Sequence, residues 1–210
     1  MIVPAAGDPP PATAILEAVR ALGQGQPIGI PTDTVYGLAV DPFRPGAADR
    51  IFAAKRRPRD VTLPLLVSGI DQALAVAAAV PDIALELMRR YWPGALTLVV
   101  PSKPGLGADL GENELTVGVR APDHPVPLAL CVAAGPLATT SANRHGEPPL
   151  TTAVAVAASF GDAVPVVLDG GTCKGSPSTV VDCTGPSLTL LREGRIPWAE
   201  LQAAAGGGGS

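Results

Sequence analysis

The sequence predicts an α/β fold with one main sheet, and three observations support this class. Short apolar runs alternate with segments of helical periodicity through most of the chain, as strands alternate with helices in α/β proteins. Strand candidates cluster after residue 160, which favours a mixed sheet over an all-parallel one. The 210 residues are enough for one domain with a substantial core.

Prolines and glycines bound the first elements. Residues 1–11 contain four prolines, so we expect a disordered lead-in there. Apolar residues then recur at helical spacing from Ile15 to Leu22, and the glycines that follow end this helix. A buried strand is expected at residues 28–30, and Pro31 ends it because proline cannot donate to a sheet ladder.

Later elements are bounded in the same way. Pro58 must close a helix that begins near Ala48, and Pro81 suits the first turn of another helix. Helices are expected at residues 48–55, 71–79, 81–91, 126–134, 152–160 and 198–205. Strands are expected at residues 63–67, 96–100, 115–120, 137–140, 164–168, 179–182 and 188–191.

The remaining segments suggest connections and a tail. Residues 101–114 are rich in glycine and are expected to form a surface loop. No internal repeat or interdomain linker is evident, so residues 12–205 are expected to form a single domain. Residues 206–210, Gly-Gly-Gly-Gly-Ser, resemble a flexible tail and enter no fold argument.

Composition argues against several classes of protein. A net charge of -4 disfavours a surface that grips nucleic acid throughout, and 3% aromatic residues disfavours base-stacking platforms. Three widely spaced cysteines without a C-x-x-C pair predict neither a zinc site nor a disulfide framework. We see no secretory leader and no apolar run of the roughly 18 residues that span a bilayer. We therefore expect a reduced, cytoplasmic protein with no membrane partner.

Polar side chains gather where the first buried strand ends. Within residues 32–36 the chain offers three hydroxyl groups and one carboxylate, from Thr32, Asp33, Thr34 and Tyr36. Such a cluster after a strand is typical of a binding edge. The alternative is a turn whose Thr and Asp side chains satisfy local backbone groups.

A basic cluster ends the second predicted helix. Lys55, Arg56, Arg57 and Arg59 place four cations within five residues. The cluster is either a solvated charge run that complements the helix dipole or a phosphate clamp of Lys and two-pronged Arg donors. The sequence contains neither a P-loop nor a G-x-G-x-x-G fingerprint, so a nucleotide here would be held in another way.

Other polar groups follow later strands. Residues 139–143 read Thr-Thr-Ser-Ala-Asn, but the G-x-S-x-G elbow is missing and nothing fixes a histidine near Ser141, so covalent catalysis is not expected. Arg120 and Arg192 end apolar runs, where such a cation is either a surface residue or a partner for a carboxylate in a cleft. Ser178 lies in a Gly/Pro-containing turn. The spacing of Asp33, Asp169 and Asp182 does not match that of metal ligands. We expect these three carboxylates to be structural.

Seven motifs occur in order along the chain: PTDTVYGL, KRRP, WPGALT, VGVRAPDHP, TTSAN, PSTVVD and LLREG. Through them, roughly residues 13–200 resemble the YrdC/Sua5/TsaC family, the L-threonylcarbamoyladenylate synthases. The resemblance implies one α/β domain whose twisted mixed sheet, flanked by helices, lines a large basic concave cavity. It also implies that L-threonine, bicarbonate and ATP are condensed to threonylcarbamoyl-AMP and pyrophosphate. That product is used to make N6-threonylcarbamoyladenosine at position 37 of tRNA.

The resemblance assigns expected roles to residues of each motif. Lys55 and Arg57 would be catalytic and face the ATP phosphates, which Mg²⁺ would bridge as the cofactor. The ATP-binding residues would be Lys55, Arg57, Arg59, Thr116, Ser141, Asn143 and Arg192. The threonine-binding residues would be Thr32, Thr34, Tyr36, Arg120, Thr139 and Ser178. Cations far apart in the sequence are thus expected to converge on one cavity, with Arg120 as the partner of the amino acid's carboxylate.

The sequence departs from the family pattern in three places. Ser68 lies where longer members tend to carry a His that faces threonine. His145 stands where the pattern S-A-N-x-S-G would place Ser. The chain ends soon after LLREG, so we expect the short, TsaC-like type. Proteins that transfer the threonylcarbamoyl group onward to tRNA are expected downstream partners.

Two alternatives stay open at this point. A carbamoyl-transfer relative would share the superfamily, but the hydrogenase-maturation proteins of that kind carry acylphosphatase and zinc-finger regions absent here. A double-stranded RNA-binding or ribosome-assembly factor would use the basic cavity to hold tRNA or other double-stranded RNA. Net acidity and few aromatic residues weigh against this second alternative.

Overall fold

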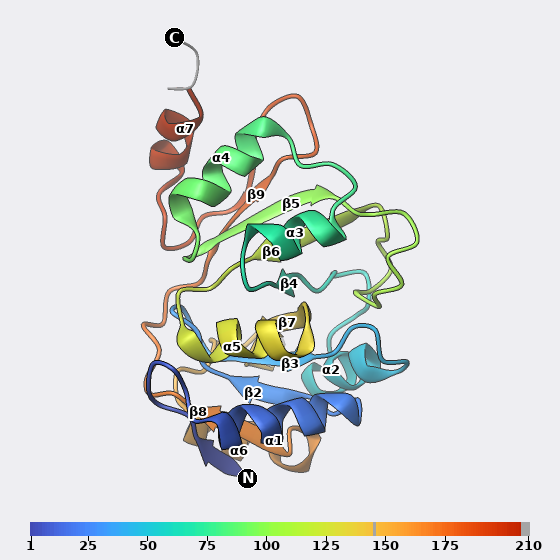
Figure 1. Cartoon of the computed structure of the whole chain (residues 1–210), viewed down its shortest axis with the longest axis vertical. Helices are drawn as coiled ribbons and strands as arrows, with labels where there is room; N and C mark the ends of the chain where they lie inside the picture. The colour runs from blue at the N-terminus through green and yellow to red at the C-terminus, as the bar shows by residue number, and fades with distance from the viewer. Residues whose placement is uncertain (145, 207–210) are drawn as a thin grey trace.

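The computed structural model describes residues 1–144 and 146–206, which form one large mixed sheet with helices packed around it (Figure 1). The strand order is β1-β8-β2-β3-β7-β4-β6-β5-β9-β10. The pairs β1–β8, β2–β8, β4–β6 and β5–β9 are parallel and the other pairs are antiparallel. The predicted α/β class with a mixed sheet is confirmed.

The elements lie close to the expected positions. The strands are β1 (Ile2–Pro4), β2 (Ile28–Ile30), β3 (Gly37–Val40), β4 (Leu65–Leu66), β5 (Leu96–Pro101), β6 (Thr116–Arg120), β7 (Leu137–Ser141), β8 (Val166–Asp169), β9 (Thr179–Asp182) and β10 (Thr189–Arg192). The helices are α1 (Ala12–Gly23), α2 (Ala47–Lys55), α3 (Ile70–Val76), α4 (Asp82–Tyr91), α5 (Pro125–Ala134), α6 (Ala153–Phe160), the 3₁₀ helix η1 (Gly161–Ala163) and α7 (Trp198–Gly206).

The expected disordered lead-in at residues 1–11 is wrong. Ile2, Val3 and Pro4 form β1, which pairs in parallel with β8 at the edge of the sheet. Two β-prone apolar residues are enough to form a strand here, because β8 supplies an edge with free hydrogen-bonding groups. The number of prolines in this segment gave no sign of that partner. The pairing makes β1 part of the same sheet as the rest of the domain, and α1 begins after Pro11. At the other end Gly206 closes α7, and the rest of the expected tail lies outside the described residues.

Two central strands also differ from expectation. β3 is not among the expected strands, and it begins with Gly37, a residue type that is depleted in strands. A Cβ at Gly37 would lie 2.9 Å from Thr139 Cγ2, so glycine lets β3 and β7 approach. β4 is shorter than the expected strand at 63–67, since Pro64 has no N–H to donate and the Leu63 amide bonds to the Leu110 carbonyl oxygen instead.

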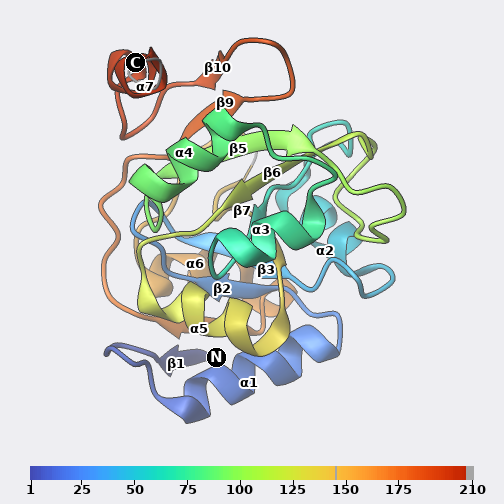
Figure 2. The ribbon, with the colours of Figure 1, turned by 45° about the horizontal axis from the view of Figure 1, so that its top comes forward.

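Helices cover both faces of the sheet. α1 and α5 pack together over β2 and β8 on one face, where Ala18, Leu22, Leu130 and Leu168 belong to one apolar cluster. α6 packs over the same strands from the opposite face. α3 and α4 cover β6 and β5, and α7 packs on α4 (Figure 2). None of the helices in the described part of the chain is long and apolar enough to cross a membrane.

The two-residue period of the central strands separates core from cavity. In β5 Leu96 and Leu98 are fully buried in the core, whereas Thr97 between them faces a cavity. In β6 Val117 and Val119 likewise enter the core, and the alternate residues Thr116, Gly118 and Arg120 line that cavity. One face of the central sheet thus supplies the floor of a cavity.

Candidate functional site

A cavity of about 560 Å³ lies on this sheet face. Its size is that of an ordinary small-molecule site. The predicted residues that line it come from the β2–β3 loop and from sheet strands or the segments beside them: Thr32, Thr34, Tyr36, Arg57, Thr116, Arg120, Thr139, Ser141, Ser178 and Arg192. None of the lining residues in the described chain carries a carboxylate. Three guanidinium groups therefore meet in one cavity from positions far apart in the sequence.

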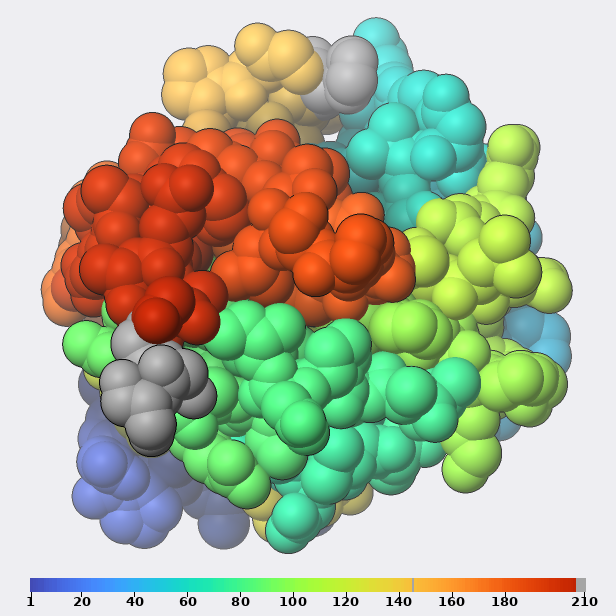
Figure 3. Space-filling model, turned by 90° about the horizontal axis from the view of Figure 1, so that it is seen from above, coloured from blue at the N-terminus to red at the C-terminus, as the bar shows by residue number. Residues whose placement is uncertain are grey.

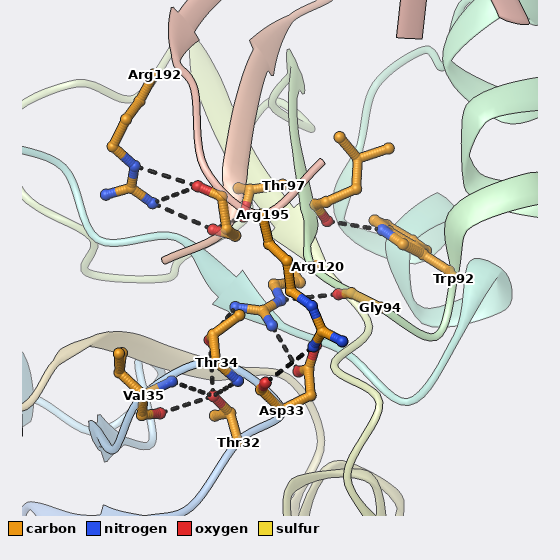
Figure 4. A network of polar contacts seen from close by, with 12 residues as sticks. Thr32, Asp33, Thr34, Val35, Trp92, Gly94, Thr97, Arg120, Arg192 and Arg195 are labelled. Atoms are coloured by element: carbon orange, nitrogen blue, oxygen red, sulfur yellow. Dashed lines mark hydrogen bonds and ion pairs between the residues drawn. The ribbon is translucent and has the colours of Figure 1, made fainter. Parts of the chain in front are cut away.

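Arg120 is anchored at one end of the cavity. Its Nη2 donates to Asp33 Oδ1 at 2.6 Å, its Nη1 to Thr34 Oγ1 at 3.0 Å and its Nε to the Gly94 carbonyl oxygen at 2.9 Å (Figure 4). The side chains of both Arg120 and Asp33 are buried. Burial lowers the pKa of Arg120, and the Asp33 carboxylate opposes that shift. These contacts use three of the five N–H groups of the guanidinium, so its orientation is fixed.

The β2–β3 loop is shaped by its own hydroxyl groups. Thr32 Oγ1 accepts from the amides of Thr34 and Val35 and donates to the Val35 carbonyl oxygen at 2.6 Å. The Thr34 hydroxyl lies 2.9 Å from Thr32 Oγ1 and accepts from Arg120. Tyr36 is fully buried and its hydroxyl donates to the Gly171 carbonyl oxygen. The turn interpretation is confirmed, because Thr32 closes the turn, and the same residue lines the cavity.

Arg57 and Arg192 carry charge at another part of the cavity. Arg57 Nη1 donates to Thr140 Oγ1 at 3.0 Å and Nη2 to the Val61 carbonyl oxygen at 3.1 Å. Its Nε is buried and has no hydrogen-bond partner among the described residues. Burial lowers the pKa of Arg57, Asp60 opposes this, and the charge of Arg192 lowers it further. Two like charges that influence one another in a cavity favour an anionic ligand.

Ser178 links the last strands to the cavity. Arg192 Nη2 donates to the Ser178 carbonyl oxygen at 2.9 Å and to Ser178 Oγ at 3.1 Å. Ser178 Oγ also lies 3.0 Å from Thr97 Oγ1 on β5. The hydroxyls and the guanidinium thus form one polar wall (Figure 4).

Lys55 and Asn143 meet behind the cavity instead of lining it. The Lys55 ammonium group is almost completely buried and donates to the carbonyl oxygens of Ser141 and Asn143 and to Asn143 Oδ1. Burial lowers the pKa of Lys55 to about 8, and Arg57 adds to the shift. Ser141 Oγ donates to Asn143 Oδ1 at 2.6 Å, with no histidine in that contact. Lys55 therefore fixes the loop that follows β7.

Arg59 and Ser68 lie away from the cavity lining. Arg59 pairs with Asp49 and Asp109 and stacks over the ring of Phe52. Ser68 is absent from the lining, and its amide donates to Gln72 Oε1. His145 lies outside the described residues.

Asp169 and Asp182 have structural contacts. Asp169 Oδ1 accepts from the Gly171 amide, and Asp182 Oδ1 accepts from the amide and the hydroxyl of Thr184. Within residues 1–144 and 146–206 no group of three or more His, Cys, Asp or Glu side chains could hold a metal ion. A divalent ion here would need ligands from a bound anion.

Sequence reasoning assigned no site role to Thr97 or Arg195. Thr97 could have been found, because it is the polar member of an alternating strand between Leu96 and Leu98. Arg195 could not, because its contact with the Asp33 carbonyl oxygen depends on the turn after β10.

Comparisons with known proteins find relatives over most of the chain. The family model Sua5_yciO_yrdC, described as "Telomere recombination", matches residues 20–194. A putative threonylcarbamoyl-AMP synthase of Mycobacterium tuberculosis (strain H37Rv) is 40% identical over 193 residues, which cover 91% of this chain and 89% of that protein. The threonylcarbamoyl-AMP synthase of Bacillus subtilis (strain 168) is 38% identical over 195 residues, 91% of this chain and 56% of that protein.

A solved structure is similar over almost the whole chain. The crystal structure of P. abyssi Sua5 complexed with L-threonine superposes with a TM-score of 0.87 at 34% identity. The match covers 97% of this chain and 60% of that one.

Proposed function

Because the chain belongs to the Sua5/YciO/YrdC family, we propose that it is a threonylcarbamoyl-AMP synthase. The reaction condenses L-threonine, bicarbonate and ATP to threonylcarbamoyl-AMP and pyrophosphate, for modification of tRNA. The convergence of Arg57, Arg120 and Arg192 on one cavity carries this proposal, since every substrate of the reaction has an anionic group. No feature of the cavity favours the RNA-binding or carbamoyl-transfer alternatives.

Threonine binds at the Arg120 end of the cavity. Arg120 pairs with the amino acid's carboxylate through the N–H groups that its protein contacts leave over. Thr32, Thr34, Tyr36, Thr139 and Ser178 surround the rest of the molecule. The similarity to a Sua5 complexed with L-threonine supports this assignment.

ATP binds at the Arg57 and Arg192 end. The carbamate formed from threonine must attack an α-phosphate that is already anionic. Two unit charges 4 Å apart repel by about 4 kcal/mol at an effective dielectric constant near 20. Arg57 and Arg192 offset this repulsion and stabilise the charge that develops on pyrophosphate. Catalysis then rests on positioning and electrostatics without a covalent intermediate.

Lys55 and Asn143 support the ATP end without lining it. The three oxygens around the ammonium group match its three N–H donors. Lys55 therefore holds the Ser141 backbone in the position from which the Ser141 hydroxyl can contact the nucleotide. Thr116 contributes a hydroxyl from β6, while Arg59, tied to two carboxylates, steadies the end of α2.

Mg²⁺ enters with the nucleotide. The cavity lining offers hydroxyl and amide oxygens and no carboxylate, so the described residues do not form a resident magnesium site. The triphosphate oxygens would supply the anionic ligands, and the ion would bind as part of the Mg–ATP substrate.

The test is pyrophosphate release by the purified chain. With ATP, Mg²⁺, bicarbonate and L-threonine present, turnover is expected, and omission of any one substrate should abolish it. Pyrophosphate release that does not depend on threonine would contradict the proposal. A salt-dependent gel shift with double-stranded RNA in the absence of such turnover would favour the RNA-binding alternative.

A further inference from the structure

The segment after β10 brings a fourth guanidinium to the threonine end. The amides of Gly194 and Ile196 both donate to Thr179 Oγ1, at 3.0 and 3.1 Å, and the Arg195 amide donates to the Pro177 carbonyl oxygen. A Cβ at Gly194 would lie 2.4 Å from the Pro177 carbonyl oxygen, so the segment can pack this closely only with glycine. Arg195 therefore projects from a fixed backbone. Figure 3 shows this C-terminal part of the chain covering one end of the molecule.

The Arg195 side chain reaches Asp33. Its Nη1 donates to the Asp33 carbonyl oxygen at 3.2 Å and lies 4.0 Å from Asp33 Oδ2. Asp33 Oδ1 is the oxygen that accepts from Arg120. Figure 4 shows both guanidinium groups beside the one carboxylate. The Asp33 side chain is 5% exposed and that of Arg195 40%, so the carboxylate is held inside and Arg195 approaches it from the solvent side.

The charges of this cluster do not balance. Arg120 and Asp33 alone would form a buried neutral pair, which is a poor receptor for another carboxylate. With Arg195 added, two guanidinium groups share one carboxylate and one positive charge remains. Burial is the main cause of the lowered pKa of Arg120, and Asp33 opposes it; the charges of Arg192 and Arg195 lower this pKa further, so both arginines lie close enough to act on Arg120.

We propose that Arg195 is a positioning residue that sets the affinity for the α-carboxylate of threonine by sharing Asp33 with Arg120. It does not line the cavity and acts through Asp33. This inference rests on the proposed function for the identity of the amino acid. The charge-sharing itself rests on the contacts of Asp33 with the two arginines.

The test compares two ligands that differ in one charge. L-Threonine carries the α-carboxylate and L-threoninamide does not. In Arg195→Gln the dissociation constant for L-threonine, measured by calorimetry, should rise about three- to fivefold, as expected for a partly exposed ion pair. Binding of L-threoninamide and the KM for ATP should stay within about twofold. Arg195→Lys should retain most of the affinity for L-threonine.

A second variant removes the shared carboxylate. In Asp33→Asn/Arg195→Gln, Arg120 keeps its charge without a competing anion, so affinity for L-threonine should recover relative to Arg195→Gln. Arg89→Gln, on an exposed face of α4, is the matched control and should change nothing. Equal losses for both ligands in Arg195→Gln, or an unchanged affinity for L-threonine, would overturn the inference.

Pyrophosphate release by the wild type separates the two proposals. If the wild type shows threonine-dependent turnover and Arg195→Gln binds L-threonine with unaltered affinity, the role of Arg195 is rejected and the synthase activity stands. If L-threonine binding depends on Arg195 but the wild type shows no turnover, the synthase activity is rejected and the sharing of Asp33 by Arg120 and Arg195 stands.

Discussion

The Lys55 ammonium group donates to the carbonyl oxygen of Asn143 over 2.7 Å, although 88 positions separate the two residues. The contact joins the C-terminal end of α2 to the loop after β7 and takes place behind the cavity. A buried cation whose contacts are neutral oxygens is costly unless all its donors are used. This bond network therefore makes Lys55 a structural requirement for the loop after β7.

The first prediction concerns the pH dependence of stability. Because the pKa of Lys55 is lowered from 10.5 to about 8, between these pH values the unfolded chain holds a proton that the folded chain has released. Unfolding then takes up a proton, so this residue makes the free energy of unfolding rise with pH across that window. The full effect is on the order of 3 kcal/mol.

Urea denaturation at several pH values measures this effect. The difference between wild type and Lys55→Met should be flat from about pH 6 to 7.5 and should then shift in favour of the wild type up to about pH 10.5. Lys103→Met, at an exposed position, is the control and should show no such shift. A constant difference over the whole range would show that Lys55 titrates normally.

The second prediction concerns the phosphate end. Arg57→Gln should lower kcat/KM for ATP by about 10²–10³, because it removes a charge that offsets repulsion during attack on the α-phosphate. Arg56→Gln changes an exposed neighbour in the same basic cluster and should leave kcat/KM near the wild-type value. Steady-state pyrophosphate release measures both. Equal losses in the two variants would mean that the charge of the cluster matters and the position of Arg57 does not.

The third prediction concerns selectivity between threonine and serine. One methyl group in a pocket is worth about 1–3 kcal/mol, so serine should be used at roughly a tenth to a hundredth of the threonine rate. Competition between the two amino acids in the pyrophosphate assay measures the ratio. Discrimination above about 10⁴ would require a contact beyond the pocket that surrounds Arg120 and Thr34.

The sequence predicted the class, most elements and much of the cavity lining, for identifiable reasons. Strands such as β5 and β6 have strong apolar alternation, and proline or glycine marks their ends. Cations such as Arg120 and Arg192 stand at strand ends, where side chains from neighbouring strands meet. The local sequence was sufficient to predict an element wherever that element has a clear apolar period and a proline or glycine at its end.

The remainder depends on contacts between distant segments. β1 forms because β8 offers an edge, and β3 contains a glycine that only the approach of Thr139 explains. The family resemblance implies that Lys55 faces the ATP phosphates, but acceptors from β7 and the loop after it take all three of its donors. Arg195 reaches Asp33 through the turn after β10. Such placements follow from tertiary structure and leave no periodic trace in the sequence.

The fourth prediction tests the close approach of β3 and β7. In Gly37→Ala the new Cβ would lie 2.9 Å from Thr139 Cγ2, so the strands must separate or the side chain must move. The expected loss is about 1–3 kcal/mol in the free energy of unfolding, typical of overpacking in a tight core. The control Gly23→Ala places a Cβ at the end of α1 with nothing within 4 Å, and should be neutral or slightly stabilising.

Thr139→Ser provides the matched rescue, because it removes the methyl group that the new Cβ meets and keeps the hydroxyl that donates to the Leu137 carbonyl oxygen. In Gly37→Ala/Thr139→Ser the free energy of unfolding should recover by more than the two single changes predict when added, a coupling that a double-mutant cycle measures. Additive effects would mean that the Gly37→Ala cost comes from elsewhere, such as the Thr140 carbonyl oxygen at 3.4 Å. A recovered stability would establish that the contact between these two side-chain positions sets the spacing of β3 and β7, and with it the position of Thr139 in the cavity.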